Sequence, residues 1–114
     1  MQIVRENISI DELKKMSEKM FGNLVKAVVD IEKKIMVVDA ELHADQENLL
    51  LQNGSEQKNL WGINLHPEEI GSEDFIEFDS MINLRPSQGN RSRGVDNLNI
   101  QKAIRAIVDT LVTK

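Results

Sequence analysis

Two neighbouring runs of branched apolar residues most constrain the fold of this chain. Leu24–Ile31 and Ile35–Ala40 are rich in Val and Ile, which favour buried strands. Only Glu32–Lys34 separates the two runs, and so short a connection joins strands as an antiparallel hairpin. The connection has no Asn-Gly pair, so the type of turn stays open. The sequence therefore predicts a hairpin of two buried strands.

The clearest helix start in the chain precedes this hairpin. Ser9 is a favourable N-cap residue, and Glu12 stands three positions later, which makes a capping box. Ile8 and Leu13 occupy the two positions of a hydrophobic staple. Gly22 is placed to end the helix. The residues at helical spacing that we expect to be buried are Ile10, Leu13, Met16, Met20 and Phe21.

The segment Glu41–Gly54 allows two interpretations. Asp45 can cap a short helix that runs through Gln52, buries Leu49 and Leu50, and stops at Gly54. Alternatively, the Asn53-Gly54 pair forms a hairpin turn and the leucines before it lie in a strand. We favour the helix, because the residues before Gln52 are better helix formers than strand formers.

A second hairpin is predicted further along the chain. Leu60–Leu65 and Phe75–Leu84 both alternate in the manner of strands, and the acidic loop Pro67–Asp74 connects them. On one side of the later strand we expect mostly apolar side chains, namely Ile76, Phe78, Ser80, Ile82 and Leu84. The other side carries Phe75, Glu77, Asp79, Met81 and Asn83. If His66 lies opposite Phe75, the pairs that follow are Asn64 with Glu77 and Gly62 with Asp79. Gly62 would then leave a hollow beside a carboxylate.

The last element is a helix over Leu98–Val112, capped by Asp96 or Asn97. Its apolar stripe is Ile100, Ile104, Ile107, Val108 and Leu111. With a short first strand within Met1–Glu6, the predicted order is β-α-β-β-α-β-β-α. Hairpins joined by helices indicate an α+β fold, a mainly antiparallel sheet of about five strands with helices packed on one face. At this length, residues 1–114 form a single domain.

Composition narrows the classes of function. The net charge of −5 argues against broad binding to nucleic acid. The chain has no cysteine, which excludes disulfides and thiolate metal sites. No apolar run approaches the length that spans a bilayer, and no basic-then-apolar leader is visible. We therefore expect a cytoplasmic protein that is not bound to a membrane.

Three long segments carry a resemblance to a known family. They are VVDAELHAD, NGSEQKNLWGINLHPEE and FIEFDSMINLRPSQGNRSRGV. With these segments the chain resembles, over nearly its whole length, a family of small uncharacterised prokaryotic proteins described as a domain of unknown function. The resemblance implies a shared fold, and it supplies no activity, cofactor or catalytic residue.

A cationic loop in this acidic chain is the first candidate site. The window Arg85–Gly94 carries +3 and no acidic residue, so the rest of the chain carries −8. The loop leads into the start of the last helix, and helix N-termini bind anions. Guanidinium groups suit phosphate and carboxylate ligands. The predicted ligand-binding residues are Arg85, Ser87, Asn90, Arg91, Ser92 and Arg93. This favours a small anion-binding domain, against the alternative that the arginines brace the fold by pairing with its acids.

The open face of the second hairpin gives an alternative function. Glu77 and Asp79 would point the same way about 7 Å apart, from the rise of a strand. Such a pair can perform acid–base chemistry or hold a divalent cation. With His43, it would serve a small hydrolase or isomerase that acts on a phosphorylated or carboxylated molecule. A solvated polar face of a sheet is the commoner outcome of this pattern.

A third cluster surrounds His43. If extended, the segment would place Asp39, Glu41, His43 and Asp45 on one face, a set that resembles a hard-metal site. It lacks a defined ligand spacing, so a strand exit followed by a helix cap is the favoured interpretation and no metal is predicted. A protein-interaction module, or a homodimer that pairs through an exposed strand edge, is the third hypothesis for function.

Overall fold

A five-stranded antiparallel sheet forms the centre of the molecule, and the computed structural model describes all of residues 1–114. The spatial order of its strands is β1 (Gln2–Val4), β4 (Ile35–Val38), β3 (Val25–Asp30), β5 (Leu60–Leu65) and β6 (Ile76–Glu77). Every neighbouring pair is antiparallel. The predicted α+β class and mainly antiparallel sheet of five strands are therefore confirmed.

The hairpin of β3 and β4 is the predicted one. Val29 lies opposite Met36, and the side chain of Asp30 holds the turn. Its Oδ1 accepts hydrogen bonds of 2.9 Å from the backbone N–H groups of Glu32 and Lys33. Lys34 adopts a left-handed backbone, with φ 58°, so the turn closes without glycine.

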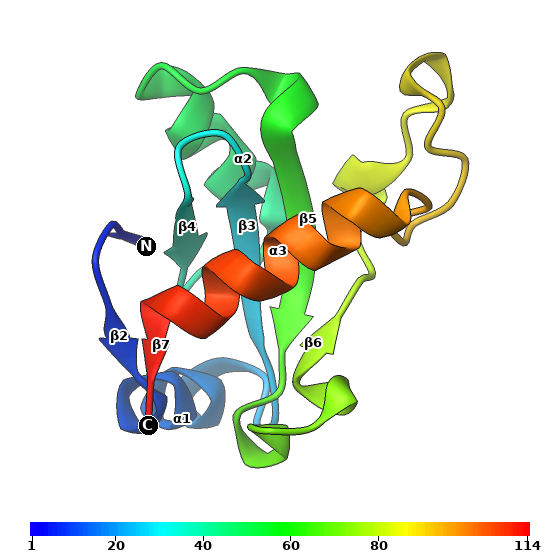
Figure 1. Cartoon of the computed structure of the whole chain (residues 1–114). Helices are drawn as coiled ribbons and strands as arrows, with labels where there is room; N and C mark the ends of the chain where they lie inside the picture. The colour runs from blue at the N-terminus through cyan, green and yellow to red at the C-terminus, as the bar shows by residue number, and fades with distance from the viewer.

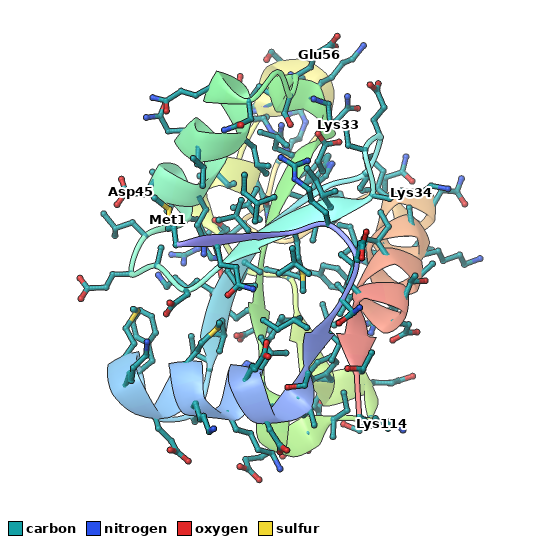
Figure 2. The ribbon with its side chains drawn as sticks, turned by 90° about the vertical axis from the view of Figure 1, so that its left-hand side faces the viewer. Met1, Lys33, Lys34, Asp45, Glu56 and Lys114 are labelled. Atoms are coloured by element: carbon teal, nitrogen blue, oxygen red, sulfur yellow. The ribbon has the colours of Figure 1, made fainter.

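Helices cover both faces of the sheet, which corrects the expectation that they pack on one face. The helices are α1 (Ile10–Met20), α2 (His43–Gln52) and α3 (Leu98–Leu111). In Figure 1, α3 crosses the front of the sheet and α2 lies behind it; Figure 2 shows them on opposite sides. Ala27 and Val29 of β3 pack in the core shared with α1 and α3, whereas Val28 packs with Leu50 of α2. Because Val28 of β3, Val37 of β4 and Leu60 of β5 make the second face apolar as well, both faces need cover.

The start of α1 is as predicted, and its buried stripe is shorter. The Oγ of Ser9 accepts the N–H of Glu12 at 3.1 Å, and Gly22 follows the helix with φ +92°. After Ser17 the helix contributes no buried residue. Met20 and Phe21 were expected in the core, but they are 36% and 40% exposed. The ring of Phe21 instead lies beneath a cation, described below.

The helix interpretation of Glu41–Gly54 is confirmed, with a different start. α2 begins at His43, and Leu42 occupies the N-cap position without a side-chain hydrogen bond. Asp45, the expected cap, lies in the first turn and points outward in Figure 2. Leu50 is fully buried, as predicted.

The strand expected over Phe75–Leu84 is much shorter than predicted. Asn64 does lie opposite Glu77, but the chain leaves the sheet after Glu77. The side chain of Asn83 takes the place of further strand, because its Oδ1 accepts the N–H of Gly62 at 2.8 Å and its Nδ2 donates to the Gly62 carbonyl at 2.9 Å. The predicted faces are consequently exchanged at the end of the segment: Asn83 is fully buried and Leu84 is 42% exposed.

The expected hollow beside Gly62 does not exist. A Cβ atom built on Gly62 would lie 2.5 Å from the Oγ and 2.6 Å from the Cβ of Ser80. Ser80 is itself buried. The side chain of Ser80 therefore fills the space that the missing side chain of Gly62 leaves.

The last helix is capped as predicted. The Oδ1 of Asn97 accepts the N–H groups of Asn99 at 2.8 Å and Ile100 at 3.3 Å. After α3 the chain forms the short strand β7 (Val112–Thr113), which pairs in parallel with β2 (Ile8–Ser9). This second small sheet, which the sequence analysis did not include, joins the two ends of the domain (Figure 1). None of the helices has the length and apolar character required to cross a membrane.

We predict that Gly62→Ala lowers the free energy of unfolding by about 1 to 3 kcal/mol, the usual cost of overpacking. Adding Ser80→Gly should recover part of that loss, because the two positions are in contact. Ser87→Gly, at an exposed position, is the control: combined with Gly62→Ala, it should recover none of the lost free energy of unfolding. Urea denaturation of the single and double variants measures the difference, and equal losses in both double variants would show that Ser80 is not the obstacle.

Candidate functional site

A hollow of about 430 Å³ lies between the start of α2, the faces of β3 and β5, and the segment that follows β6. It brings together residues that are far apart in the chain. Four of the predicted site residues line it, namely His43, Glu77, Asp79 and Arg93. Lys26 and Asn64 also line it. Two other hollows have volumes of about 470 Å³: the one beside the end of α3 contains none of the predicted residues, and the one beside His66 contains only Glu77.

A row of three side chains crosses the floor of this hollow. Lys26 of β3 lies opposite Asn64 of β5, which lies opposite Glu77 of β6. The Nδ2 of Asn64 donates to Glu77 Oε1 at 3.0 Å and lies 3.5 Å from the Asp79 carbonyl oxygen. The Oδ1 of Asn64 is buried and has no hydrogen-bond partner. The row thus runs from a cation through an amide to a carboxylate.

Lys26 is a cation without a carboxylate partner. The salt bridges of the protein do not include it. Its ammonium lies 5.4 Å from the centre of the Phe21 ring, an arrangement in which the ring face attracts the cation. This contact accounts for the exposed position of Phe21 at the end of α1.

The two carboxylates of the hollow have separate partners. His66 Nε2 lies 3.1 Å from Glu77 Oε1, and hydrogen bonds from His66 and Asn64 lower the pKa of Glu77. Asp79 accepts a hydrogen bond of 2.8 Å from the Nε of Arg93. Glu77 and Asp79 therefore do not share a proton, because each carboxylate has a hydrogen-bond partner of its own.

His43 is held as a neutral base. It is 7% exposed, and its Nε2 lies 2.7 Å from the Ile63 carbonyl oxygen. A carbonyl oxygen only accepts, so Nε2 carries the proton and Nδ1 keeps its lone pair. Burial lowers the pKa of His43 below its ordinary value of 6.5.

The start of α2 is an uncapped helix end that lines the hollow. Leu42, His43 and Ala44 all contribute to its wall, and no side chain caps the helix. The turn's own hydrogen bonds begin at Asp45, whose N–H donates to the Leu42 carbonyl at 3.2 Å. The preceding N–H groups, of His43 and Ala44, have no acceptor within the helix. They place a partial positive charge at the hollow.

The predicted arginine loop is held together by a buried asparagine. Asn90 is 4% exposed, and its Nδ2 donates to the carbonyl groups of Asn83, Ser92 and Gly94 at 2.7, 3.1 and 2.9 Å. Its Oδ1 accepts the N–H of Asp96 at 2.8 Å. Asn90 therefore serves as an internal connector in this structure.

Two donors of this loop, the backbone N–H of Arg91 and the hydroxyl of Ser92, already meet a carboxylate of the chain. Asp96 accepts the Arg91 N–H at 2.8 Å and the Ser92 hydroxyl at 2.5 Å. These hydrogen bonds lower the pKa of Asp96. The adjacent start of α3 is capped by Asn97. The start of α3 therefore lacks the uncapped N–H groups that the start of α2 has, and the side-chain donors of the loop that stay uncommitted include those of Arg91 and Arg93.

The three arginines point to three different places. Arg85 is buried, with its guanidinium 4.2 Å from the centre of the Trp61 ring. It donates to the Leu60 carbonyl at 2.7 Å and the Gln57 carbonyl at 2.5 Å, and burial lowers its pKa. Arg91 is exposed and forms no ion pair, and Arg93 reaches Asp79 at the hollow. The contacts of Arg85 fit the brace that was the alternative for these arginines.

The remaining predicted residues do not join the hollow. Ser87 is exposed. Asp39 has a left-handed backbone, φ 66°, and lies 3.8 Å from the ammonium of Lys19. Glu41 and Asp45 are exposed, whereas His43 is buried, so the three side chains do not share one face. No group of three or more His, Asp or Glu side chains is arranged to hold a metal ion.

Comparison with protein families identifies a family that matches nearly the whole chain. The family described as "Protein of unknown function (DUF5674)" matches residues 2–111. The chain belongs to this family. No curated protein and no solved structure matches the chain. Family membership therefore supports a shared fold, and any function has to be inferred from the geometry of the hollow.

The segments that carry the family resemblance also build the hollow. Apart from Leu24 and Lys26, every residue that lines it lies in one of those three segments. The sequence analysis did not include Lys26 or Asn64 among the site residues. A signal for Lys26 was present, since it is a single cation within the apolar run Leu24–Ile31. No local signal marked the unpaired oxygen of Asn64, which depends on contacts with β6.

We predict that Arg85→Ala lowers the free energy of unfolding by about 3 kcal/mol, because it removes hydrogen bonds of a charged group and a cation–π contact. Arg91→Ala is the matched control and should change stability by less than about 0.5 kcal/mol, as exposed positions do. Chemical denaturation of both variants measures this. A small loss for Arg85→Ala would contradict the brace and return Arg85 to the candidate ligand-binding residues.

Proposed function

We propose that the hollow binds a small molecule with an anionic group, a carboxylate or a phosphate. The observation that carries the proposal is the uncapped start of α2, which lines the hollow together with Lys26. This retains anion binding as the function that the sequence favours, and it places the anion at α2 in place of the arginine loop and α3.

The local charges support this assignment. The free N–H groups of His43 and Ala44 supply hydrogen bonds and the positive end of the helix dipole. Lys26 supplies a full charge that no carboxylate neutralises. Arg93 pairs with Asp79 through its Nε, and its two terminal nitrogens have no hydrogen bond within the protein. An anion in the hollow would therefore meet donors from β3, from the loop that carries Arg93, and from the start of α2.

We expect Lys26→Gln to weaken anion binding about tenfold, since one charge-assisted hydrogen bond contributes roughly 1.5 to 3 kcal/mol. Phosphate, sulfate, acetate, malonate and succinate are the probes, and the measurements are thermal shift and NMR titration. Arg91→Gln removes an exposed charge that has no ion pair, and it should leave the dissociation constant unchanged.

Two results would count against the proposal. One is that none of these anions binds the unaltered protein. The other is that Arg91→Gln weakens binding as much as Lys26→Gln, because binding would then follow overall charge or the arginine loop.

The state of His43 supports a second candidate function, an enzyme that uses acid–base chemistry as an isomerase or hydrolase. A neutral imidazole with a fixed tautomer and a free Nδ1 is suited to accept a proton. The buried position sets its pKa below 6.5, so the base form is present at neutral pH. Glu77 and Asp79 line the same hollow and could stabilise a positively charged histidine.

For this second candidate we predict that an anion found in the binding screen exchanges a C–H proton, or is cleaved, when incubated with the protein in D₂O. The rate should fall only as the pH drops through the lowered pKa of His43, which lies below the ordinary value of 6.5, because His43 then becomes protonated. His43→Gln retains a donor for the Ile63 carbonyl, so it should spare binding and abolish the reaction. Proton NMR follows the ligand. A bound ligand that stays unchanged for days would leave binding alone as the function.

A further inference from the structure

Leu42 creates two unfavourable features at the hollow. It occupies the N-cap position of α2, where Ser, Thr, Asp and Asn are the favoured residues. Leucine has no side-chain acceptor, so the N–H groups of His43 and Ala44 stay uncapped, and Leu42 itself is 55% exposed. Both features lie at the same hollow. A bound molecule that presents an anionic group beside an apolar part would remove both.

A second exposed apolar residue lines the hollow from a different element. Met81, in the segment after β6, is 63% exposed. Leu24 and Ile82 extend the apolar part of the lining. Exposed apolar residues that gather at one hollow indicate a binding surface, whereas isolated ones need no explanation. The volume of about 430 Å³ suits a small organic molecule.

His43 adds an acceptor at the same place. Its Nε2 donates to the Ile63 carbonyl, and its Nδ1 has no hydrogen bond although the residue is only 7% exposed. Nδ1 does not belong to the unpaired polar atoms that the protein covers completely, so it stays accessible from the hollow that His43 lines. A neutral Nδ1 accepts a hydrogen bond, which calls for a donor on the ligand. The positive end of the α2 dipole disfavours an ammonium group here, and a hydroxyl group supplies the donor without a charge.

We infer that the ligand is a 2-hydroxy carboxylic acid with an apolar side chain. This inference rests on the proposed anion binding and specifies the class of the anion. The carboxylate accepts the N–H groups of His43 and Ala44, the hydroxyl donates to His43 Nδ1, and the apolar side chain lies against Leu42 and Met81. The carboxylate and hydroxyl of such an acid are on adjacent carbons, which matches an N–H group and an imidazole that belong to one residue.

Four acids test the two contacts separately: propionate, lactate, hexanoate and 2-hydroxyhexanoate. NMR titration of the unaltered protein should show that hexanoate binds at least about tenfold more tightly than propionate, because each buried methylene contributes about fourfold. The hydroxyl should add about fivefold at either chain length, the usual effect of one hydrogen bond. Norleucine has an ammonium group in place of the hydroxyl and should bind more weakly than 2-hydroxyhexanoate.

Leu42→Ser separates binding from stability. The introduced hydroxyl can cap α2, so without ligand this variant should unfold a few degrees higher than the unaltered protein. It should also bind hexanoate about tenfold more weakly, because the apolar contact is gone and the Ala44 N–H is occupied. Leu98→Ser is the matched control: Leu98 is 68% exposed at the start of α3, outside the hollow, and its replacement should leave every affinity unchanged.

The outcomes separate this inference from the proposed function. Equal affinities for hexanoate and propionate overturn the apolar side chain and leave anion binding in place. Equal affinities with and without the hydroxyl, or tighter binding of norleucine, overturn the hydroxy acid. Unchanged binding of hexanoate by Leu42→Ser, or an equal loss in Leu98→Ser, also overturns the inference, because the hydrocarbon chain then associates elsewhere. Binding of phosphate alone overturns the inference only, and failure of phosphate and of every carboxylate overturns both.

Discussion

The pairing of the Asn83 side chain with the backbone of Gly62 determines the shape of the candidate site. A side-chain carboxamide has the same kinds of donor and acceptor as a peptide group. Asn83 therefore satisfies the N–H and the carbonyl of Gly62, which a longer β6 would otherwise have paired. The chain is thereby released from the sheet after Glu77. The released segment folds over the edge of β5 and supplies Asp79, Ser80 and Met81 to the wall of the hollow. A regular hairpin here would have produced a flat polar face.

The same device recurs in the arginine loop. Asn90 holds three carbonyl groups and one N–H, which the loop cannot satisfy through regular secondary structure. Arg85 satisfies further carbonyl groups, those of Leu60 at the start of β5 and of Gln57 just before it. Buried polar groups that are fully paired favour one conformation over others. Asn90 and Arg85, two of the ligand donors predicted from the sequence, therefore serve backbone groups that an irregular segment leaves unpaired.

Local patterns predicted much of the fold. The hairpin of β3 and β4, the caps at Ser9 and Asn97, and the pairing of Asn64 with Glu77 depend on neighbouring residues or on strand alternation, and each is present. The errors arose where distant residues decide. Asn83 ends a strand by contacting a residue 21 positions away, and the pairing of Ile8 with Val112 joins opposite ends of the chain. The cover on both faces of the sheet could have been predicted from the sequence, because β4 and the Ala27–Val29 part of β3 are apolar without alternation.

For the site, the sequence indicated which chemical groups take part, but it did not indicate which residues each group contacts. His43, Glu77, Asp79 and Arg93 come from separate candidate clusters, and the fold unites them in one hollow. The arginine loop shows what sequence alone leaves out, since a local excess of positive charge does not show which groups are already paired. At a helix start, the distinction rests on a single residue. Asn97 has a side chain that caps α3, whereas Leu42 has none that can cap α2. The uncapped helix start, beside an unneutralised lysine, is therefore the stronger indication of a site for an anion in this chain.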